Sequence, residues 1–204
     1  MKKIYYATIV AAGLLLGASF ANAALVFVET DTAKRTEAFD VPGFATLPVG
    51  SMVSLGHLDF TGFGSQTVTY TYLGQESTFK DEFHDLLSGH QLLESNPVGT
   101  SVSSVVSVTG PLSFEFEGTV GKFAINGGDW DKNTSIGLIG TNMLVGSVVY
   151  DYVLGYNDSA GSKKLGDWDD FVIGVSAVPE PETYAMLIIG VGLIGFSLRK
   201  QPVR

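Results

Sequence analysis

Alternation of polar and apolar residues is the feature that most restricts the fold of this chain. Its clearest example is residues 66–73, where threonines alternate with Val68, Tyr70 and Tyr72. A period of two puts successive side chains on opposite faces of a strand. Comparable segments between turn residues are 24–30, 52–60, 102–109, 112–117, 121–125, 147–154 and 171–178. These short strands predict a mainly β protein, an antiparallel β-sandwich for which a jelly roll is one topology.

Residues 79–94 break this rhythm. Their apolar residues recur at helical spacing, and acidic residues cluster near the start of the segment. The residues at this spacing are Phe79, Phe83, Leu86, Leu87, His90 and Leu93. The pattern predicts one short helix packed over a sheet or at its end. Gly89 is expected to weaken the second half of this helix by about 1 kcal/mol relative to alanine.

The N-terminal end has the pattern of a secretory signal peptide. Lys2-Lys3 precedes an apolar stretch at residues 9–20, which is followed by the small-residue cleavage pattern Ala21-Asn22-Ala23. We predict that residues 1–23 are removed and that the mature chain begins at Ala24. A permanent anchor is the alternative, but the apolar stretch is short for a membrane span.

The C-terminal end combines three features in a fixed order. Val178-Pro179-Glu180-Pro181 is followed by an apolar run at residues 184–198 and then by Arg199-Lys200. The two prolines favour an extended segment without two backbone donors, which suits a processing site. As a helix the apolar run would be about 22 Å long, shorter than the roughly 30 Å hydrocarbon core, so it predicts a temporary transmembrane helix. The basic residues would stay on the cytoplasmic side.

This C-terminal segment, residues 178–204, resembles the PEP-CTERM sorting tail of exported bacterial proteins. The matching residues are Pro179-Glu180-Pro181, the apolar run and Arg199-Lys200. The resemblance implies export by the secretion machinery in a Gram-negative bacterium that makes an exopolysaccharide. It also implies cleavage near the Pro-Glu-Pro by an exosortase-type membrane peptidase. The protein would then pass transiently through the inner membrane to the cell surface or the extracellular matrix.

Between the two ends, residues 24–177 have the length of one domain that can bury its own core. Residues 24–178 contain seven Lys or Arg and nineteen Asp or Glu, a net charge of −12. This charge disfavours binding to nucleic acid or to an anionic surface and suits divalent cations. Since the chain has no cysteine, neither disulfides nor thiol chemistry can contribute.

Two acidic loops contain Asp-Trp-Asp. The first is at residues 127–133, and the second comprises residues 157–159 followed by residues 166–170. Alternate aspartates in a glycine-bearing turn can direct oxygen ligands at one Ca²⁺ ion. The second loop therefore predicts a candidate calcium site at Asp167, Asp169 and Asp170, although it lacks the pattern of an EF-hand. Solvated turn residues are the alternative interpretation.

The tryptophans of these loops, Trp130 and Trp168, allow a second kind of site. An exposed indole face can stack on a pyranose while nearby acids accept hydrogen bonds from its hydroxyls. Trp130 and Trp168 are therefore candidate sugar contacts. The alternative is that each indole closes the hydrophobic core.

No catalytic set emerges from the remaining polar residues. Glu115 and Glu117 alternate with phenylalanines, so they share one strand face and could pair for glycoside hydrolysis. However, that reaction needs its carboxylates on opposite sides of a sugar. His84, flanked by Asp81 and Asp85 in the predicted helix, could bind a metal, with a solvated helix face as the alternative. No catalytic residue is predicted, and Ca²⁺ is the one cofactor considered.

The sequence thus leaves three classes of function. The predicted class is a structural protein of the surface or of an exopolysaccharide-rich, biofilm-type matrix, processed at its C-terminal tail. A carbohydrate-binding module is the first alternative, and a secreted glycoside hydrolase is the second. A binding module would be retained on a polysaccharide through its tryptophans, whereas a hydrolase would release reducing ends.

Overall fold

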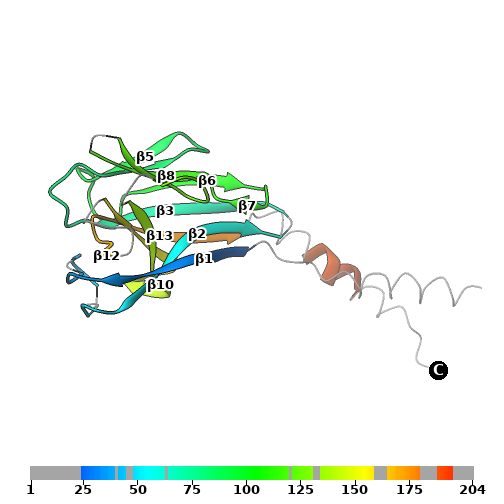
Figure 1. The fold of residues 1–204 in the computed structure, drawn as a ribbon. Helices are drawn as coiled ribbons and strands as arrows, with labels where there is room; N and C mark the ends of the chain where they lie inside the picture. Colours follow the sequence, from blue (N-terminus) through cyan, green and yellow to red (C-terminus); the bar gives the residue numbers. More distant parts are fainter. Residues whose placement is uncertain are drawn as a thin grey trace, which may run out of the picture.

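The computed structural model describes residues 24–39, 41–44, 48–62, 64–119, 121–130, 134–158, 165–179 and 188–194. Within these residues the protein is mainly antiparallel β (Figure 1). The strands are β1 (Ala24–Arg35), β2 (Met52–Thr61), β3 (Gln66–Gly74), β4 (Glu82–Asp85), β5 (His90–Leu93), β6 (Ser101–Val106), β7 (Gly110–Pro111), β8 (Phe114–Gly118), β9 (Lys122–Ile125), β10 (Ser135–Val145), β11 (Val148–Asn157), β12 (Leu165–Gly166) and β13 (Phe171–Pro179).

The strands form two sheets. The larger has the order β12-β1-β2-β10-β11-β13-β3-β6, with β7 pairing to β2, and the smaller has the order β5-β4-β8-β9. Every pairing between these strands is antiparallel except that of β1 with β12. The mainly β prediction is confirmed. A jelly roll has eight strands in two Greek keys, so this division into nine and four strands departs from it.

The two sheets face each other across an aromatic core. Tyr70 of β3 lies 4.8 Å from Phe83 of β4, measured between ring centroids. Phe116 of β8 stacks on Tyr156 of β11 at 5.2 Å, with an interplanar angle of 3°. Because β8 alternates, Phe114 and Phe116 are buried while Glu115 and Glu117, which follow them in turn, face outward. Each such aromatic pair contributes about 0.5–1.5 kcal/mol beyond the burial of its area.

The helix predicted at residues 79–94 is wrong, because the segment forms the β4–β5 hairpin. Asp85 organises the turn: its carboxylate accepts bonds from the Leu87 N–H (3.1 Å) and the Ser88 hydroxyl (2.6 Å). Gly89 closes the turn at φ +73°, a conformation that favours glycine. The helical spacing of the apolar residues was therefore coincidental.

The burial of the hairpin side chains explains why strands win over a helix. Phe83 and Leu92 lie directly opposite each other in the β4–β5 register, and both are fully buried in the core. In contrast, Leu86 and Leu87 lie in the turn and are 47% and 54% exposed. A helix could not place Phe83 and Leu92 side by side on one sheet face. Nor could it provide the pairing of β4 with β8.

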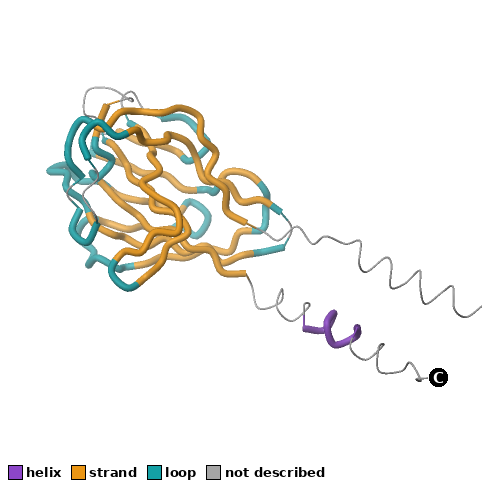
Figure 2. Tube along the Cα trace, turned by 90° about the horizontal axis from the view of Figure 1, so that it is seen from below, coloured by secondary structure: helices purple, strands orange, loops and turns teal. Residues whose placement is uncertain are grey.

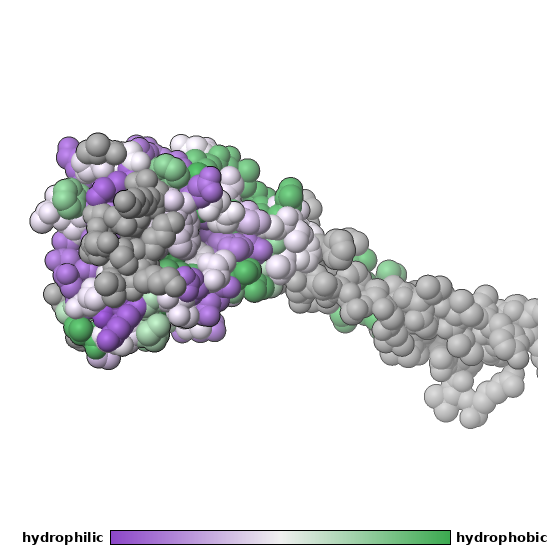
Figure 3. Space-filling view, in the orientation of Figure 1, coloured by the Kyte–Doolittle hydropathy of each residue, from purple (hydrophilic) through white to green (hydrophobic). Residues whose placement is uncertain are grey.

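The outer face of the larger sheet is partly covered by the connection between β1 and β2. Phe39 and Val41 of this connection pack on Tyr150, Val153 and Val172. Hydrophilic and hydrophobic residues are interspersed over the molecular face seen in Figure 3. The core thus extends to both faces of the larger sheet.

The first strand starts and the last strand ends at the same end of the sandwich. β1 begins and β13 finishes at this end, which we call the tail end (Figure 1). A short helix at residues 188–194 lies outside both sheets (Figure 2). In the part of the chain that the structure describes, no helix has the length and apolar character needed to cross a membrane. Most of the predicted transmembrane run at residues 184–198 lies outside the described residues.

Candidate functional site

The predicted processing segment begins inside the last core strand. In the β13–β3 register Val178 lies opposite Thr67, and Pro179 lies opposite Gln66. The pairing of β13 with β11 ends at Val175, so the last residues of β13 pair with β3 alone. A proline is tolerated at such a position, where one side of the strand has no ladder partner. The folded domain therefore runs directly into the Pro-Glu-Pro.

Several predicted processing residues lie outside the part of the chain that the structure describes. Glu180, Pro181, Arg199 and Lys200 lie outside the described residues, as does the signal peptide with Ala21 and Ala23.

The second acidic loop is organised by Trp168, which points into the protein. Trp168 has no exposed surface, and its Nε1 donates a hydrogen bond to the Ser135 hydroxyl (3.0 Å). Gly137 and Gly155 lie opposite each other in the β10–β11 register and make room for it. A Cβ at residue 137 would lie 2.7 Å from the indole Cδ1, and one at residue 155 would overlap the Trp168 carbonyl oxygen. Of the two interpretations given for Trp168, the structure supports closure of the core and contradicts an exposed sugar contact.

The buried indole separates the three aspartates predicted to share one calcium ion. Asp167 and Asp169 lie with Glu76 in one cluster, in which one carboxylate oxygen from each residue lies within 4.8 Å of the others. Asp170 belongs to a different cluster, with Asp81 and Asp158. In this cluster, too, one carboxylate oxygen from each residue lies within 4.8 Å of the others. The structure therefore divides the predicted ligand set between two neighbouring groups of acids.

The first group has a cation built into the fold. Arg35, at the end of β1, is fully buried, and its guanidinium lies 4.9 Å from the centre of the Phe39 ring. Burial lowers the pKa of Arg35, while the charges of Asp169 and then Asp167 raise it. Asp169 and Asp167 are thus electrostatic partners of the buried Arg35 guanidinium.

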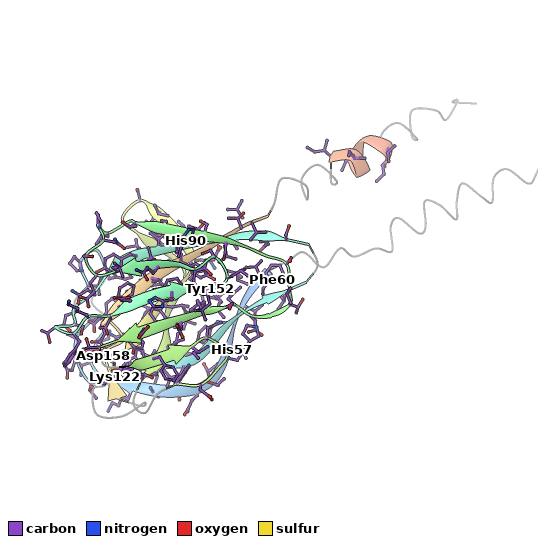
Figure 4. The ribbon with its side chains drawn as sticks, turned by 90° about the horizontal axis from the view of Figure 1, so that it is seen from above. His57, Phe60, His90, Lys122, Tyr152 and Asp158 are labelled. Atoms are coloured by element: carbon purple, nitrogen blue, oxygen red, sulfur yellow. The ribbon has the colours of Figure 1, made fainter. Side chains whose placement is uncertain are left out.

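The second group joins three parts of the chain. Asp81 directly precedes β4, Asp158 directly follows β11, and Asp170 directly precedes β13. All three are buried. The Asp158 backbone N–H donates to Asp170 Oδ2 (2.7 Å), and the Ser77 hydroxyl donates to Asp158 Oδ2 (3.5 Å). Asp158 lies at the end of the sandwich opposite the tail end (Figure 4).

The electrostatics of this group reflect buried negative charge. The pKa of Asp81 is raised to about 7, first by burial and then by the charge of Asp158, while a side-chain hydrogen bond with Ser77 and, to a smaller extent, Lys122 lower it. The pKa of Asp170 is raised to about 9, mainly by burial and further by Asp158, Asp167 and Asp81. Its hydrogen bond from Asp158 works in the opposite direction. Within the described part of the chain, Lys122 is the cation that acts on Asp81, and its effect is smaller than that of burial or of Asp158.

Sequence reasoning missed Glu76 and did not connect Asp81 with Asp158. Glu76 is brought to the loop by a backbone hydrogen bond in which its N–H donates to the Asp169 carbonyl oxygen (2.9 Å). Asp81 stood in the segment predicted as a helix, so its direction could not be inferred. The one available signal was that Asp158 and Asp170 both flank strongly alternating segments.

The other tryptophan borders an open hollow of about 400 Å³. The hollow is lined by Thr30, His57, Gly127, Gly128, Asp129 and Trp130. Trp130 is partly buried, and its Nε1 donates to the Ile125 carbonyl oxygen (3.1 Å). Its polar edge is thus engaged with the protein, which leaves the exposed part of the ring beside the hollow. Asp131, from the same Asp-Trp-Asp motif, lies outside the described residues.

The smaller sheet carries a cluster around His84 on its outward face. His84 Nδ1 lies 3.6 Å from a carboxylate oxygen of Glu115 and 3.8 Å from one of Glu117, and its Nε2 lies 3.1 Å from Glu82. The expected neighbours Asp81 and Asp85 are not among these contacts, because the segment is a strand. Both glutamates of β8 lie on one side of a sheet, whereas glycoside hydrolysis needs acids that flank a sugar.

Residues 177–201 match the family model of the PEP-CTERM protein-sorting motif. The match defines the class: an exported protein with a C-terminal sorting signal that a membrane peptidase processes. In particular, the chain is a PEP-CTERM motif-containing protein targeted to an exosortase and exported through the membrane to the cell surface. The predicted resemblance is confirmed. No curated protein and no solved structure matches the chain.

Proposed function

We propose that the protein is a non-enzymatic structural component of the cell surface or extracellular matrix. The observation that carries this proposal is the direct continuation of β13 into the sorting motif, through Pro179. Because the strand leads straight into the motif, processing would leave the sandwich with no long C-terminal extension. Its opposite end, where Asp158 lies, would then face away from the site of processing (Figure 4).

Processing is tested with Pro179→Ala combined with Pro181→Ala in the producing bacterium. We expect the double variant to stay in the membrane fraction at full size, whereas the wild-type protein is shortened and reaches the surface or the medium. Pro97→Ala, in an exposed loop, is the matched control and should be processed normally. Normal shortening and release of the double variant would contradict the role given to the Pro-Glu-Pro.

A carbohydrate-binding module is the second candidate, favoured by the hollow beside Trp130. An indole face next to a carboxylate and an imidazole provides both stacking and hydrogen-bonding groups for a sugar. The test is retention of the purified protein on the exopolysaccharide of the producing strain. Trp130→Ala should abolish retention, whereas Phe79→Ala, which removes a 51% exposed aromatic outside the hollow, should not.

The same assay separates these candidates from a hydrolase. Release of reducing ends that is lost in Glu115→Gln would replace the structural proposal with an enzymatic one. Retention without release would support the binding module. If the protein does neither yet remains in the isolated matrix, the purely structural role is supported.

A further inference from the structure

We propose that Asp81, Asp158 and Asp170 form a binding site for one Ca²⁺ ion. The site joins the start of β4, the end of β11 and the start of β13 at the end of the sandwich opposite the tail end. It differs from the set predicted from the acidic loop alone, because it contains Asp170 but neither Asp167 nor Asp169.

The spacing of the three carboxylates fits one shared cation. One oxygen from each residue lies within 4.8 Å of the other two. Ca²⁺ binds oxygen ligands at about 2.3–2.6 Å, so ligands on opposite sides of the ion are separated by at most about 5 Å. A single ion can therefore contact all three groups without a large rearrangement of the backbone.

Asp81 provides a second, independent observation. Its side chain is fully buried, and neither of its carboxylate oxygens makes a hydrogen bond of good geometry among the described residues, although the Ser77 hydroxyl is close enough to lower its pKa. Its backbone N–H donates to Glu94 Oε1 (2.8 Å). A buried carboxylate without a partner is costly, and such groups are normally paired with a charge or bound to a metal. A bound cation would satisfy these oxygens.

Further oxygen atoms lie near the Asp81 carboxylate. A Cβ at Gly118 would lie 2.7 Å from Asp81 Oδ1 and 3.2 Å from the Tyr156 hydroxyl. The absence of a side chain at residue 118 therefore allows the Asp81 carboxylate to lie close to the backbone of β8 and to the Tyr156 hydroxyl. The Ser77 hydroxyl, which bonds Asp158, is a further neutral oxygen nearby. Water can complete the six to eight ligands that Ca²⁺ takes.

The ligand chemistry selects Ca²⁺ among the common metals. All three side chains offer oxygen, with no imidazole or thiolate in the group, so a hard cation is favoured over zinc or copper. Mg²⁺ requires near-ideal octahedral geometry at about 2.0–2.1 Å and usually keeps several waters. A buried, irregular set of carboxylates from three segments is better suited to the larger and more flexible coordination of Ca²⁺.

The neighbouring acidic group provides an internal comparison. Carboxylate oxygens of Glu76, Asp167 and Asp169 also lie within 4.8 Å of one another, but the buried guanidinium of Arg35 interacts electrostatically with Asp169 and Asp167. Among the described residues, the cation that acts on the pKa of Asp81 is Lys122, whose ammonium lies 5.6 Å from the centre of the Phe79 ring and whose contribution is smaller than that of burial or of Asp158. The Asp81 group is therefore the one whose charge an external cation would balance.

Calcium titration of the full-length protein in detergent, after treatment with EDTA, tests the site. We expect calorimetry to show saturable binding of one Ca²⁺ per chain and a higher melting temperature with millimolar Ca²⁺. Asp81→Asn should weaken binding by about ten-fold or more, since even the loss of a group behind a ligand costs about 10–100-fold. Glu117→Gln removes one charge from the exposed sheet face and should bind as the wild type.

Two further arms keep the test decisive. The Asp169→Asn variant, which changes the acidic group near Arg35, should retain Ca²⁺ binding. If Asp169→Asn lost Ca²⁺ binding while Asp81→Asn retained it, the assignment would be overturned. Tb³⁺ in place of Ca²⁺ should give tyrosine-sensitised emission, because the Tyr156 hydroxyl borders the site, and Ca²⁺ should displace it. Absence of Ca²⁺ binding by the wild-type protein at millimolar concentration would overturn the proposal whatever the variants do, as would equal affinity for Mg²⁺.

Discussion

Replacement of Gly155 by alanine tests whether Trp168 organises the acidic end of the sandwich. A Cβ at residue 155 would overlap the carbonyl oxygen of Trp168 and lie 3.0 Å from its carbonyl carbon and its Cβ. These atoms belong to the backbone or are attached directly to it, so a rotamer change cannot relieve the contact. Since Trp168 is fully buried, relief requires movement of the whole residue.

The expected cost follows from two limits. Overpacking a core usually costs about 1–3 kcal/mol, whereas removing a tryptophan side chain from a core costs about 3–5 kcal/mol. Partial displacement of Trp168 lies where these ranges meet. We therefore expect Gly155→Ala to lower the free energy of unfolding by about 3 kcal/mol.

Urea unfolding followed by tryptophan fluorescence measures this change. The wild-type emission should include a blue-shifted component from buried Trp168, and displacement in the variant should shift it to the red. Gly140→Ala is the control in strand β10, because its nearest contact is the flexible Met143 Sδ at 3.0 Å; we expect it to cost less than about 1 kcal/mol. If Gly155→Ala lay within 1 kcal/mol of the wild type with unchanged emission, the reasoning would be refuted.

Three further outcomes are expected. Phe83→Ala should cost about 3–5 kcal/mol in urea unfolding and Leu86→Ala less than about 0.5 kcal/mol, because only the first is buried; equal effects would contradict the hairpin. Asn126→Ala should cost at least about 2 kcal/mol in the same assay, since its side chain bonds both backbone groups of Leu58 and the Leu112 carbonyl; a neutral effect would show that water replaces it. Burial, with the charge of Glu94, raises the pKa of Tyr72 to about 12 from its usual 10.0, so the folded state keeps a proton that the unfolded state loses. Stability should fall between pH 10 and 12, and Tyr72→Phe should reduce this fall; an equal fall in both proteins would contradict the shift.

Strand prediction succeeded where alternation was regular and failed where packing set the pattern. All eight predicted segments overlap observed strands. β10 was missed because Gly137 and Gly140 interrupt its alternation, and these glycines reflect contacts made in three dimensions: Gly137 borders Trp168, and a register shift lies between Leu138 and Gly140. The sequence of the segment alone does not indicate such a contact.

The candidate calcium site was likewise predicted only in part, because its ligands come together through tertiary packing. Asp170 was predicted as a ligand from its loop, and Asp158 belongs to the same loop, but their neighbour Asp81 lies in a distant part of the chain. Adjacent residues in a loop point in different directions once Trp168 enters the core. Loop composition could therefore identify acids but not the group to which each belongs.

The sorting motif was readable from the chain because a membrane peptidase recognises a short linear pattern, and the β class was readable because strand periodicity is local. The pairing of strands, the inward direction of Trp168 and the separation of Asp170 from Asp167 and Asp169 arise from contacts between residues distant in sequence. Burial in a shared core assigns those partners, and the free energy of that burial belongs to the assembled sandwich rather than to any one segment.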